Sequence, residues 1–137
     1  MELYHGTDEI TAKNISDGSL LIKRELGGGE LGMGFYTADN LAMAIIFAKG
    51  RYGSSGKVVE FDIDKSEFTN LEMKLIKKRH KVFKVWRRIL KLKKRFKYLF
   101  HTDVVLAPFA TIEICWQYKF ESKKAEDFIN ESNKRLL

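Results

Sequence analysis

The basic residues of this 137-residue chain are concentrated in one segment. Residues 74–97 contain 13 Lys and Arg and no Asp or Glu, whereas the whole chain has 25 Lys and Arg against 18 Asp and Glu. The rest of the chain therefore holds 12 basic and 18 acidic residues, a formal charge of −6. This segregation indicates an acidic globular body to which a strongly basic segment has been added.

The composition is typical of one globular domain. Hydrophobic residues make up 45% and charged residues 31% of a chain long enough for one core but not for two ordinary domains. The one cysteine, Cys115, excludes an internal disulfide and fits a reducing compartment. The longest apolar run, residues 41–48, is far shorter than the ~20 residues of a membrane span, and the first residues do not resemble a secretion signal. We therefore expect a cytoplasmic protein with no transmembrane segment.

Apolar spacing and turn-forming residues predict an α+β fold with a mostly antiparallel sheet, in a single domain. Good N-cap residues, Asp8 and either Asp39 or Asn40, precede two expected helices. Five glycines within residues 27–34 predict a mobile loop, and Gly6-Thr7 predicts a turn. We expect strands over residues 3–5, 35–37, 58–63 and 103–106, and a further strand or a hairpin over 111–120. We expect helices over 8–15, from 41 to before the turn-rich residues 51–56, over 72–100 and over 123–137.

Apolar residues recur at helical spacing through residues 72–100, which predicts one long basic helix inserted into the domain. Such a helix could pack on the sheet with its charges in solvent, although ordinary surfaces mix both signs of charge. A nucleic acid, an acidic partner such as an antitoxin, or an anionic membrane surface would each complement it. The residues expected to make this contact are Lys77, Lys78, Lys81, Lys84, Arg87, Arg88, Lys91, Lys94 and Arg95.

Two glycine-containing motifs carry the chemistry of the acidic body. The first is Leu-Tyr-His-Gly-Thr at residues 3–7, and the second is Gly-Met-Gly-Phe-Tyr-Thr at residues 32–37. They resemble the NAD-binding signature of the ADP-ribosyltransferase fold, the superfamily of poly(ADP-ribose) polymerases and diphtheria-type toxins. The chain is most similar to a bacterial family of small domains, several of which sit in toxin–antitoxin-like gene pairs. The resemblance covers residues 3–63 and 103–125.

The resemblance implies a split antiparallel sheet and a site that uses NAD as co-substrate. It implies that His5 holds the nicotinamide ribose and that Tyr36 and Phe47 enclose the nicotinamide ring. Physically, His5 can donate a hydrogen bond to a ribose hydroxyl, and a glycine at position 6 lets the backbone approach the carboxamide. The residues implied to bind NAD are His5, Gly6, Thr7, Gly34, Tyr36 and Phe47.

The third catalytic position departs from the usual glutamate. The matching strand places Gln117 there, so the implied catalytic set is His5, Tyr36 and Gln117. Glu113, four residues earlier, and Asp103, at the start of the preceding strand, are the alternatives in that order. A glutamine can orient the ribose but carries no charge to place beside the cation, which favours mono-ADP-ribosylation over chain elongation.

Other functional classes find less support. The three histidines lie far apart in the sequence, so we expect no metal site. The glycine-rich residues 27–32 lack the ending of a P-loop and are interpreted as a flap over the adenosine half of NAD, with Arg24 or Lys23 within reach of a pyrophosphate.

The expected function is therefore a toxin-like NAD-dependent mono-ADP-ribosyltransferase that modifies a nucleic acid or a nucleic-acid-associated protein and releases nicotinamide. The alternatives are an NAD glycohydrolase, in which water is the acceptor, and an inactive nucleic-acid-binding module on the same fold.

Overall fold

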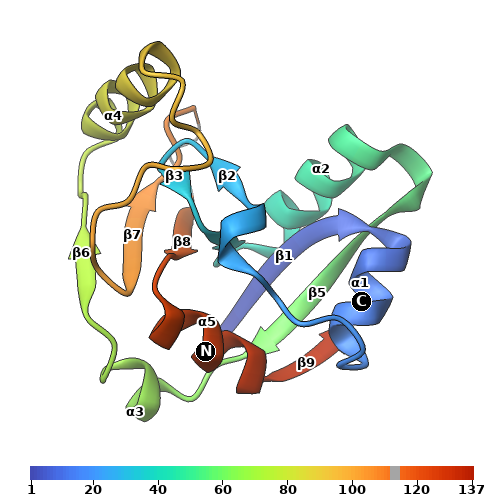
Figure 1. Ribbon diagram of the computed structural model, residues 1–137. Coiled ribbons are helices and arrows are strands. Elements are labelled where there is room, and N and C mark those ends of the chain that lie inside the picture. Colours follow the sequence, from blue (N-terminus) through green and yellow to red (C-terminus); the bar gives the residue numbers. More distant parts are fainter. Residues whose placement is uncertain (112–114) are drawn as a thin grey trace.

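The computed structural model describes residues 1–111 and 115–137, which form a mixed sheet with helices on both faces (Figure 1). The predicted α+β class is confirmed. In chain order the elements are β1 (Glu2–Asp8), α1 (Glu9–Ser16), η1 (Arg24–Leu26), β2 (Gly28–Gly29), β3 (Gly32–Met33), β4 (Phe35–Ala38), α2 (Leu41–Tyr52), η2 (Gly53–Ser55), β5 (Gly56–Asp62), α3 (Lys65–Phe68), β6 (Met73–Leu75), α4 (Arg79–Lys91), β7 (Val104–Pro108), β8 (Trp116–Phe120), α5 (Lys123–Glu131) and β9 (Asn133–Leu136).

The main sheet is almost divided in its middle. Its strand order is β6-β7-β8-β4-β1-β5-β9, and every neighbouring pair is antiparallel except β6 and β7. β1 pairs with β5 over seven registered residues, whereas β1 and β4 share one registered pair, Tyr4 with Ala38. The sheet therefore consists of two halves that are joined by a narrow junction.

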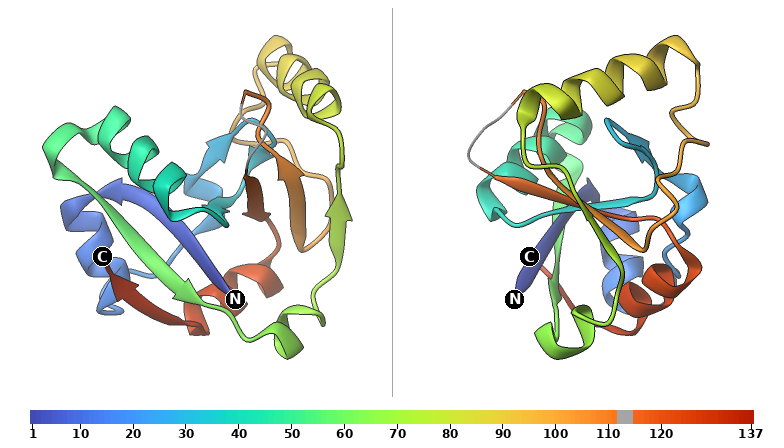
Figure 2. Two further views of the ribbon diagram at one scale, coloured as in Figure 1. Left: turned by 180° about the vertical axis from the view of Figure 1, so that it is seen from behind. Right: turned by 90° about the vertical axis from the view of Figure 1, so that its left-hand side faces the viewer.

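Side chains alternate along the strands and give the sheet a separate core on each face. On one face Leu3, Phe35 and Phe61 pack with residues of α1 and α5. On the other face α2 packs on β1 and β5 through Ala44 and Ala48, and Figure 2 shows α2 lying across β1 in the view from behind. The hairpin β2–β3 and α4 cover the other half of this second face, over β4, β7 and β8.

The two predicted N-caps are confirmed. The Asp8 carboxylate accepts a hydrogen bond of 2.9 Å from the Thr11 N–H, and the Asn40 side chain accepts one of 3.0 Å from the Met43 N–H. The predicted turn at Gly6-Thr7 is wrong, because β1 continues through both residues as they pair with β5. Helix α2 also continues to Tyr52, beyond the point at which the turn-rich sequence predicts its end.

The predicted single helix over residues 72–100 is wrong. Met73–Leu75 form β6, an edge strand that pairs in parallel with β7, and only Arg79–Lys91 are helical. The basic segment is therefore a strand–helix–strand crossover rather than a helical insertion. No local signal separates these elements, because residues 57–107 contain neither Gly nor Pro.

Helix α4 ends in a Schellman motif that has a lysine where glycine is usual. Lys93 adopts a φ of 54°, its N–H donates to the Leu90 carbonyl, and the Lys94 N–H donates to the Ile89 carbonyl at 3.0 Å. Because a left-handed residue here is usually Gly or Asn, the sequence gives no warning of this end. Lys94 and Arg95 therefore lie in the loop that returns to the sheet.

The predicted C-terminal helix over residues 123–137 is correct only in its first part. Helix α5 ends at Glu131, and Asn133–Leu136 form β9 against the outer edge of β5. Part of the predicted strand over residues 111–120 falls on residues 112–114, outside the described residues; β8 begins at Trp116.

The glycines of residues 27–34 form a packed hairpin in place of the expected mobile loop. A Cβ on Gly28 would lie 2.6 Å from the Phe96 ring, and one on Gly29 would lie 2.9 Å from the Tyr36 ring. Gly32 has a φ of +90°, which favours glycine, and its missing side chain lets the Tyr98 carbonyl approach. The hairpin is therefore held between Tyr36 and the end of the basic segment.

Candidate functional site

The first candidate residues meet at the narrow junction between β1 and β4. Met1 and Ile63 exchange two backbone hydrogen bonds, so the odd-numbered residues of β1 direct their backbone groups toward β5. The even-numbered residues, including Gly6, direct theirs toward β4. Tyr36 would be the next partner of Gly6 after the Tyr4–Ala38 pair, but this rung is absent from the described ladder.

His5 fills the place of the missing rung. Its Nδ1 lies 2.6 Å from the Tyr36 carbonyl oxygen, and its ring packs at 4.3 Å, between centroids, from the Phe35 ring. Because a carbonyl only accepts, Nδ1 carries the hydrogen and Nε2 of the neutral ring is an acceptor. The expected bond from His5 to a ribose hydroxyl therefore runs in the opposite direction, with the hydroxyl donating to Nε2.

The stability of the protein should depend on pH through His5. Burial lowers the pKa of His5 below its ordinary value of 6.5, although the hydrogen bond to Tyr36 opposes this shift. Near and below that value the unfolded chain binds a proton that folded His5 does not. We therefore expect the free energy of unfolding to fall as the pH drops below about 6.5.

Urea unfolding of the wild type and of His5→Asn between about pH 4.5 and 7.5 measures this effect. An asparagine can keep the hydrogen bond to the Tyr36 carbonyl but does not titrate. The wild type should lose stability relative to His5→Asn as the pH falls, and a constant difference between the two proteins would contradict the prediction.

Tyr36 holds the tip of the hairpin rather than lining an open pocket. Its hydroxyl donates to the Gly32 carbonyl and accepts a 3.1 Å hydrogen bond from the Leu31 N–H. Burial raises the pKa of the Tyr36 hydroxyl well above its ordinary value, and the Glu30 carboxylate adds to this rise against the opposing Leu31 bond. Tyr36 is therefore neutral, and its hydroxyl anchors the hairpin turn through its hydrogen bonds to Leu31 and Gly32.

Phe47 does not join Tyr36. Its side chain on α2 is 54% exposed, and no ring contact joins it to Tyr36 among the described residues. The predicted sandwich of a nicotinamide ring between Tyr36 and Phe47 is thus not preformed in this structure.

The other implied NAD-binding residues have packing roles. A Cβ on Gly6 would lie 2.6 Å from the Ala44 carbonyl oxygen, so this glycine sets the close approach of α2 to β1. A Cβ on Gly34 would lie 2.6 Å from Cγ of Lys119, and Thr7 is buried at the end of β1. Close packing therefore accounts for both glycines in the absence of any ligand.

Gln117 is buried and lies beside a carboxylate that the sequence does not single out. Its Nε2 donates to Glu30 Oε1 at 2.9 Å and to the Pro108 carbonyl at 3.1 Å. Glu30 comes from the hairpin turn, and its Oε1 also accepts a 3.0 Å bond from the Ala110 N–H. Glu30 is the only charged residue in residues 27–38, which is the signal that could have pointed to it.

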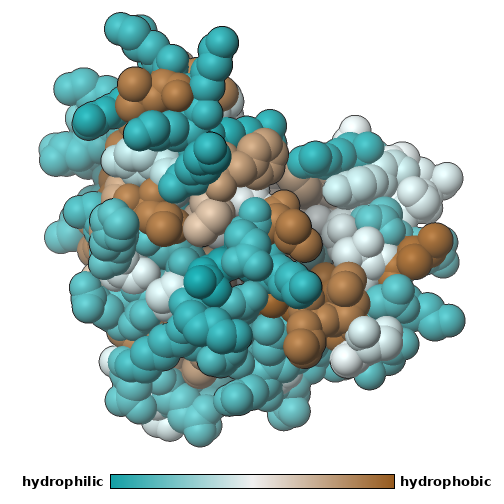
Figure 3. Space-filling view, viewed as in Figure 1, coloured by the Kyte–Doolittle hydropathy of each residue, from teal (hydrophilic) through white to brown (hydrophobic). Residues whose placement is uncertain are grey.

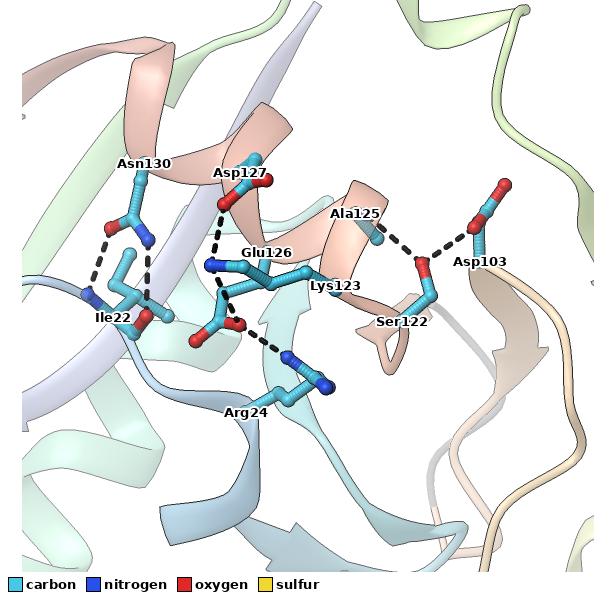
Figure 4. Close-up of polar contacts among 9 residues, drawn as sticks. All are labelled: Ile22, Arg24, Asp103, Ser122, Lys123, Ala125, Glu126, Asp127 and Asn130. Carbon is cyan, nitrogen blue, oxygen red and sulfur yellow. Dashed lines mark hydrogen bonds and ion pairs between the residues drawn. The ribbon is translucent and has the colours of Figure 1, made fainter.

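Of the two alternatives for the third catalytic position, Asp103 lies among the described residues and Glu113 does not. Asp103 is committed to the fold, because one carboxylate oxygen accepts from the Ser122 hydroxyl (Figure 4). The other oxygen accepts from the Glu72 N–H. Glu113 lies outside the described residues. Gln117 is therefore the candidate that the structure places in a polar site.

Arg24 is occupied by an ion pair. Figure 4 shows it beside Glu126 of α5, which also lies within 3.8 Å of Lys123. Lys23 is exposed. A pyrophosphate contact by Arg24 would therefore require that it leave Glu126.

The nine predicted contact residues form a basic surface, defined as Lys77, Lys78, Lys81, Lys84, Arg87, Arg88, Lys91, Lys94 and Arg95. All nine are exposed, and none forms an ion pair with an acidic residue in the part of the chain that the structure describes. In Figure 3 hydrophilic side chains surround apolar ones over α4, where Phe83 and Leu90 are also exposed. Helix α4 is fixed from below by Val82 and Ile89, which are fully buried.

Two hollows in the surface lie away from the junction. One is lined by residues that include Leu106 and Trp116, and the other by residues that include His101 and Glu121. Among the described residues no group of three or more His, Cys, Asp or Glu is placed to hold a metal ion. None of the helices in residues 1–111 and 115–137 combines the length and hydropathy that crossing a bilayer requires.

Comparison with known proteins adds no relative: no protein-family model and no curated protein matches this sequence.

Proposed function

We propose that this protein is an NAD-dependent mono-ADP-ribosyltransferase with the split-sheet architecture of that fold. The observation that carries the proposal is the junction itself, where the His5 ring bonds the Tyr36 carbonyl at the point where the sheet divides. The two motifs that resemble the NAD signature meet there. Gln117 on the next strand, paired with Ala38, adds a polar group to the same half of the sheet.

The proposed reaction breaks the bond between C1′ of the ribose and the nicotinamide nitrogen. The electron pair of that bond leaves with neutral nicotinamide, and an acceptor group uses its own lone pair to bond to C1′ and releases a proton. The transition state is an oxocarbenium-like cation, so the protein acts by holding the ribose and stabilising positive charge. Nε2 of His5 and Oε1 of Gln117 are acceptors suited to ribose hydroxyls. The His5 ring packs on Phe35 on one face of the sheet, whereas Gln117 lies on the other face under the hairpin, so both can contact one ribose only after the junction has opened.

Substrate binding in this proposal involves widening of the junction, because the side chains of His5 and Tyr36 are only partly accessible to solvent. Only one registered pair, Tyr4 with Ala38, joins β1 to β4. Widening therefore breaks few backbone hydrogen bonds, but it also parts Phe35 from Phe61, whose rings lie 5.7 Å apart in a core that both halves share.

Incubation with NAD labelled in its adenylate half tests the proposal. Label attached to a macromolecule, with equal release of nicotinamide, is the expected result. Free ADP-ribose alone would indicate the glycohydrolase, the alternative enzyme. Unchanged NAD together with nucleic-acid binding would indicate the inactive binding module, which the basic surface favours as the second candidate.

We also propose that the basic surface recruits the target, a nucleic acid or a protein bound to one, or receives an acidic antitoxin. Residues 74–97 contain thirteen Lys and Arg and no Asp or Glu, which supports this assignment. The cytoplasm is the proposed location, since NAD is abundant there and the buried Cys115 is a free thiol.

Nucleic-acid binding by the basic surface should be strongly dependent on salt. Lys84, Arg87 and Lys91 share one exposed face of α4. Replacing all three with glutamine should weaken binding to duplex DNA and lower the slope of log K against log salt by about 0.9 for each phosphate that is no longer neutralised. Fluorescence anisotropy over a salt series measures both quantities.

The matched control removes three exposed lysines elsewhere, Lys13, Lys49 and Lys65. It changes the net charge equally but leaves the basic surface intact, so it should retain most of the affinity and the slope. Equal losses in the two triple variants would show that net charge, and not this surface, determines binding.

A further inference from the structure

We propose that Glu30 supplies the negative charge that Gln117 lacks and positions the Gln117 amide for the ribose. This inference rests on the proposed transferase function and adds a residue to it. The glycine-rich hairpin thereby contributes a carboxylate to the third catalytic position.

The contacts of Gln117 fix its orientation. The two oxygens nearest the Gln117 amide nitrogen, Glu30 Oε1 and the Pro108 carbonyl oxygen, can only accept hydrogen bonds. The amide must therefore present its NH₂ group to them. Both amide hydrogens are then committed, and Oε1 has no partner among the described residues. Oε1 can therefore accept a hydrogen bond from a ribose hydroxyl, but only after the cover over Gln117, which is 1% exposed, has opened.

Glu30 is held through its neighbour Leu31 in the turn and through its own carboxylate. Leu31, the next residue, is fully buried, and its N–H donates to the Tyr36 hydroxyl. Its carbonyl accepts a 2.7 Å bond from Nζ of the buried Lys119. Oε1 of Glu30 is in turn held by Ala110 and Gln117, whereas Oε2 has no partner among the described residues.

The pair thus combines two functions that a single glutamate combines in the usual signature. The amide oxygen of Gln117 accepts from the ribose, and the Glu30 carboxylate places a charge directly behind the amide. As the bond breaks, positive charge moves from the nicotinamide ring to the ribose, so a fixed negative charge beside the ribose stabilises the transition state more than the ground state. For the ribose to reach Oε1, the cover over Gln117 must open while Glu30 keeps its bond to the amide.

Three variants separate the charge from the hydrogen bond. Glu30→Gln keeps an acceptor for Ala110 and Gln117 but removes the charge. Glu30→Gln with Gln117→Glu moves the charge onto β8; it loses the bond to Pro108, and the amide at position 30 can place either its oxygen toward the Ala110 N–H or its nitrogen toward the new carboxylate. Glu25→Gln removes an exposed carboxylate five residues away and is the control.

The measurement is the steady-state release of nicotinamide from NAD at neutral pH, after thermal melting has shown that each variant is folded. For Glu30→Gln we expect kcat to fall about 10²-fold with little change in KM. The swapped double variant should regain at least about tenfold in kcat. Glu25→Gln should match the wild type.

A wild-type kcat in Glu30→Gln would overturn the inference while leaving the proposed function intact. A swapped variant no faster than Glu30→Gln would also overturn it, because the charge would then not be what matters. If Glu30→Gln does not fold, Glu30→Asp takes its place; it should slow kcat with little change in KM, and an unchanged kcat overturns the inference. A wild type that releases no nicotinamide refutes the proposed function and this inference together.

Discussion

Replacing His5 with alanine is expected to lower the rate of nicotinamide release by about 10²–10³-fold. The change removes Nε2, the acceptor proposed for the ribose, and leaves the Tyr36 carbonyl without its partner at the junction. Steady-state release of nicotinamide by the purified protein is the measurement, with urea unfolding as a check on the fold.

Two further variants isolate the cause. His5→Asn can still donate to the Tyr36 carbonyl but lacks Nε2, so it should be as slow as His5→Ala while remaining more stable. His80→Ala changes an exposed histidine on α4 and should retain the wild-type rate. Full activity in His5→Asn would show that Nε2 plays no part in the reaction.

Replacing Lys119 with alanine is expected to lower the free energy of unfolding by about 3–5 kcal/mol. Nζ of Lys119 is fully buried, lies 2.6 Å from Glu121 Oε1 and donates to the Leu31 carbonyl, with the Phe100 ring 5.0 Å away. The variant leaves the Glu121 carboxylate buried without its cation, and its remaining partners among the described residues are the Phe100 and Thr102 N–H groups. Urea unfolding at neutral pH measures the loss.

Lys13→Ala is the control, because Lys13 is exposed on α1 and should change stability by no more than about 0.5 kcal/mol. Lys119→Met combined with Glu121→Gln removes both charges and should recover much of the loss. A loss below about 1 kcal/mol in Lys119→Ala would mean that Glu121 finds another partner or protonates at little cost.

The elements that could be predicted are those with local signals. Asp8 and Asn40 begin their helices as their side chains and the following apolar spacing indicate. The central strands around Tyr36 and Val59 are apolar enough to be recognised from composition alone. In these places local preference and tertiary packing favour the same structure.

The elements that could not be predicted depend on distant partners. β6 and β9 are short edge strands with mostly exposed side chains, and each exists because β7 or β5 offers it an open edge. Their sequences fit a helix equally well. The end of α4 is hidden for a different reason, since Lys93 takes a conformation that its residue type does not signal.

The candidate site shows the same division. His5 and Tyr36 could be paired from their motifs, and the structure brings the His5 ring to the Tyr36 backbone. The partnership of Glu30 with Gln117 joins residues 87 positions apart, and no local pattern encodes that distance. The exposure of Phe47 likewise follows from how α2 lies on β1.

The strand order also has a consequence for synthesis on the ribosome. β1, β4 and β5 all lie within the first 62 residues, and β1 and β5 can pair as soon as both have emerged. The outer edges of β4 and β5 then stay unpaired until β8 and β9, which lie within residues 116–136, have been synthesised. An open strand edge is a template for pairing with another chain. We therefore expect the nascent protein to be most prone to aggregation between these two stages, and least so once residues 116–136 have closed both edges.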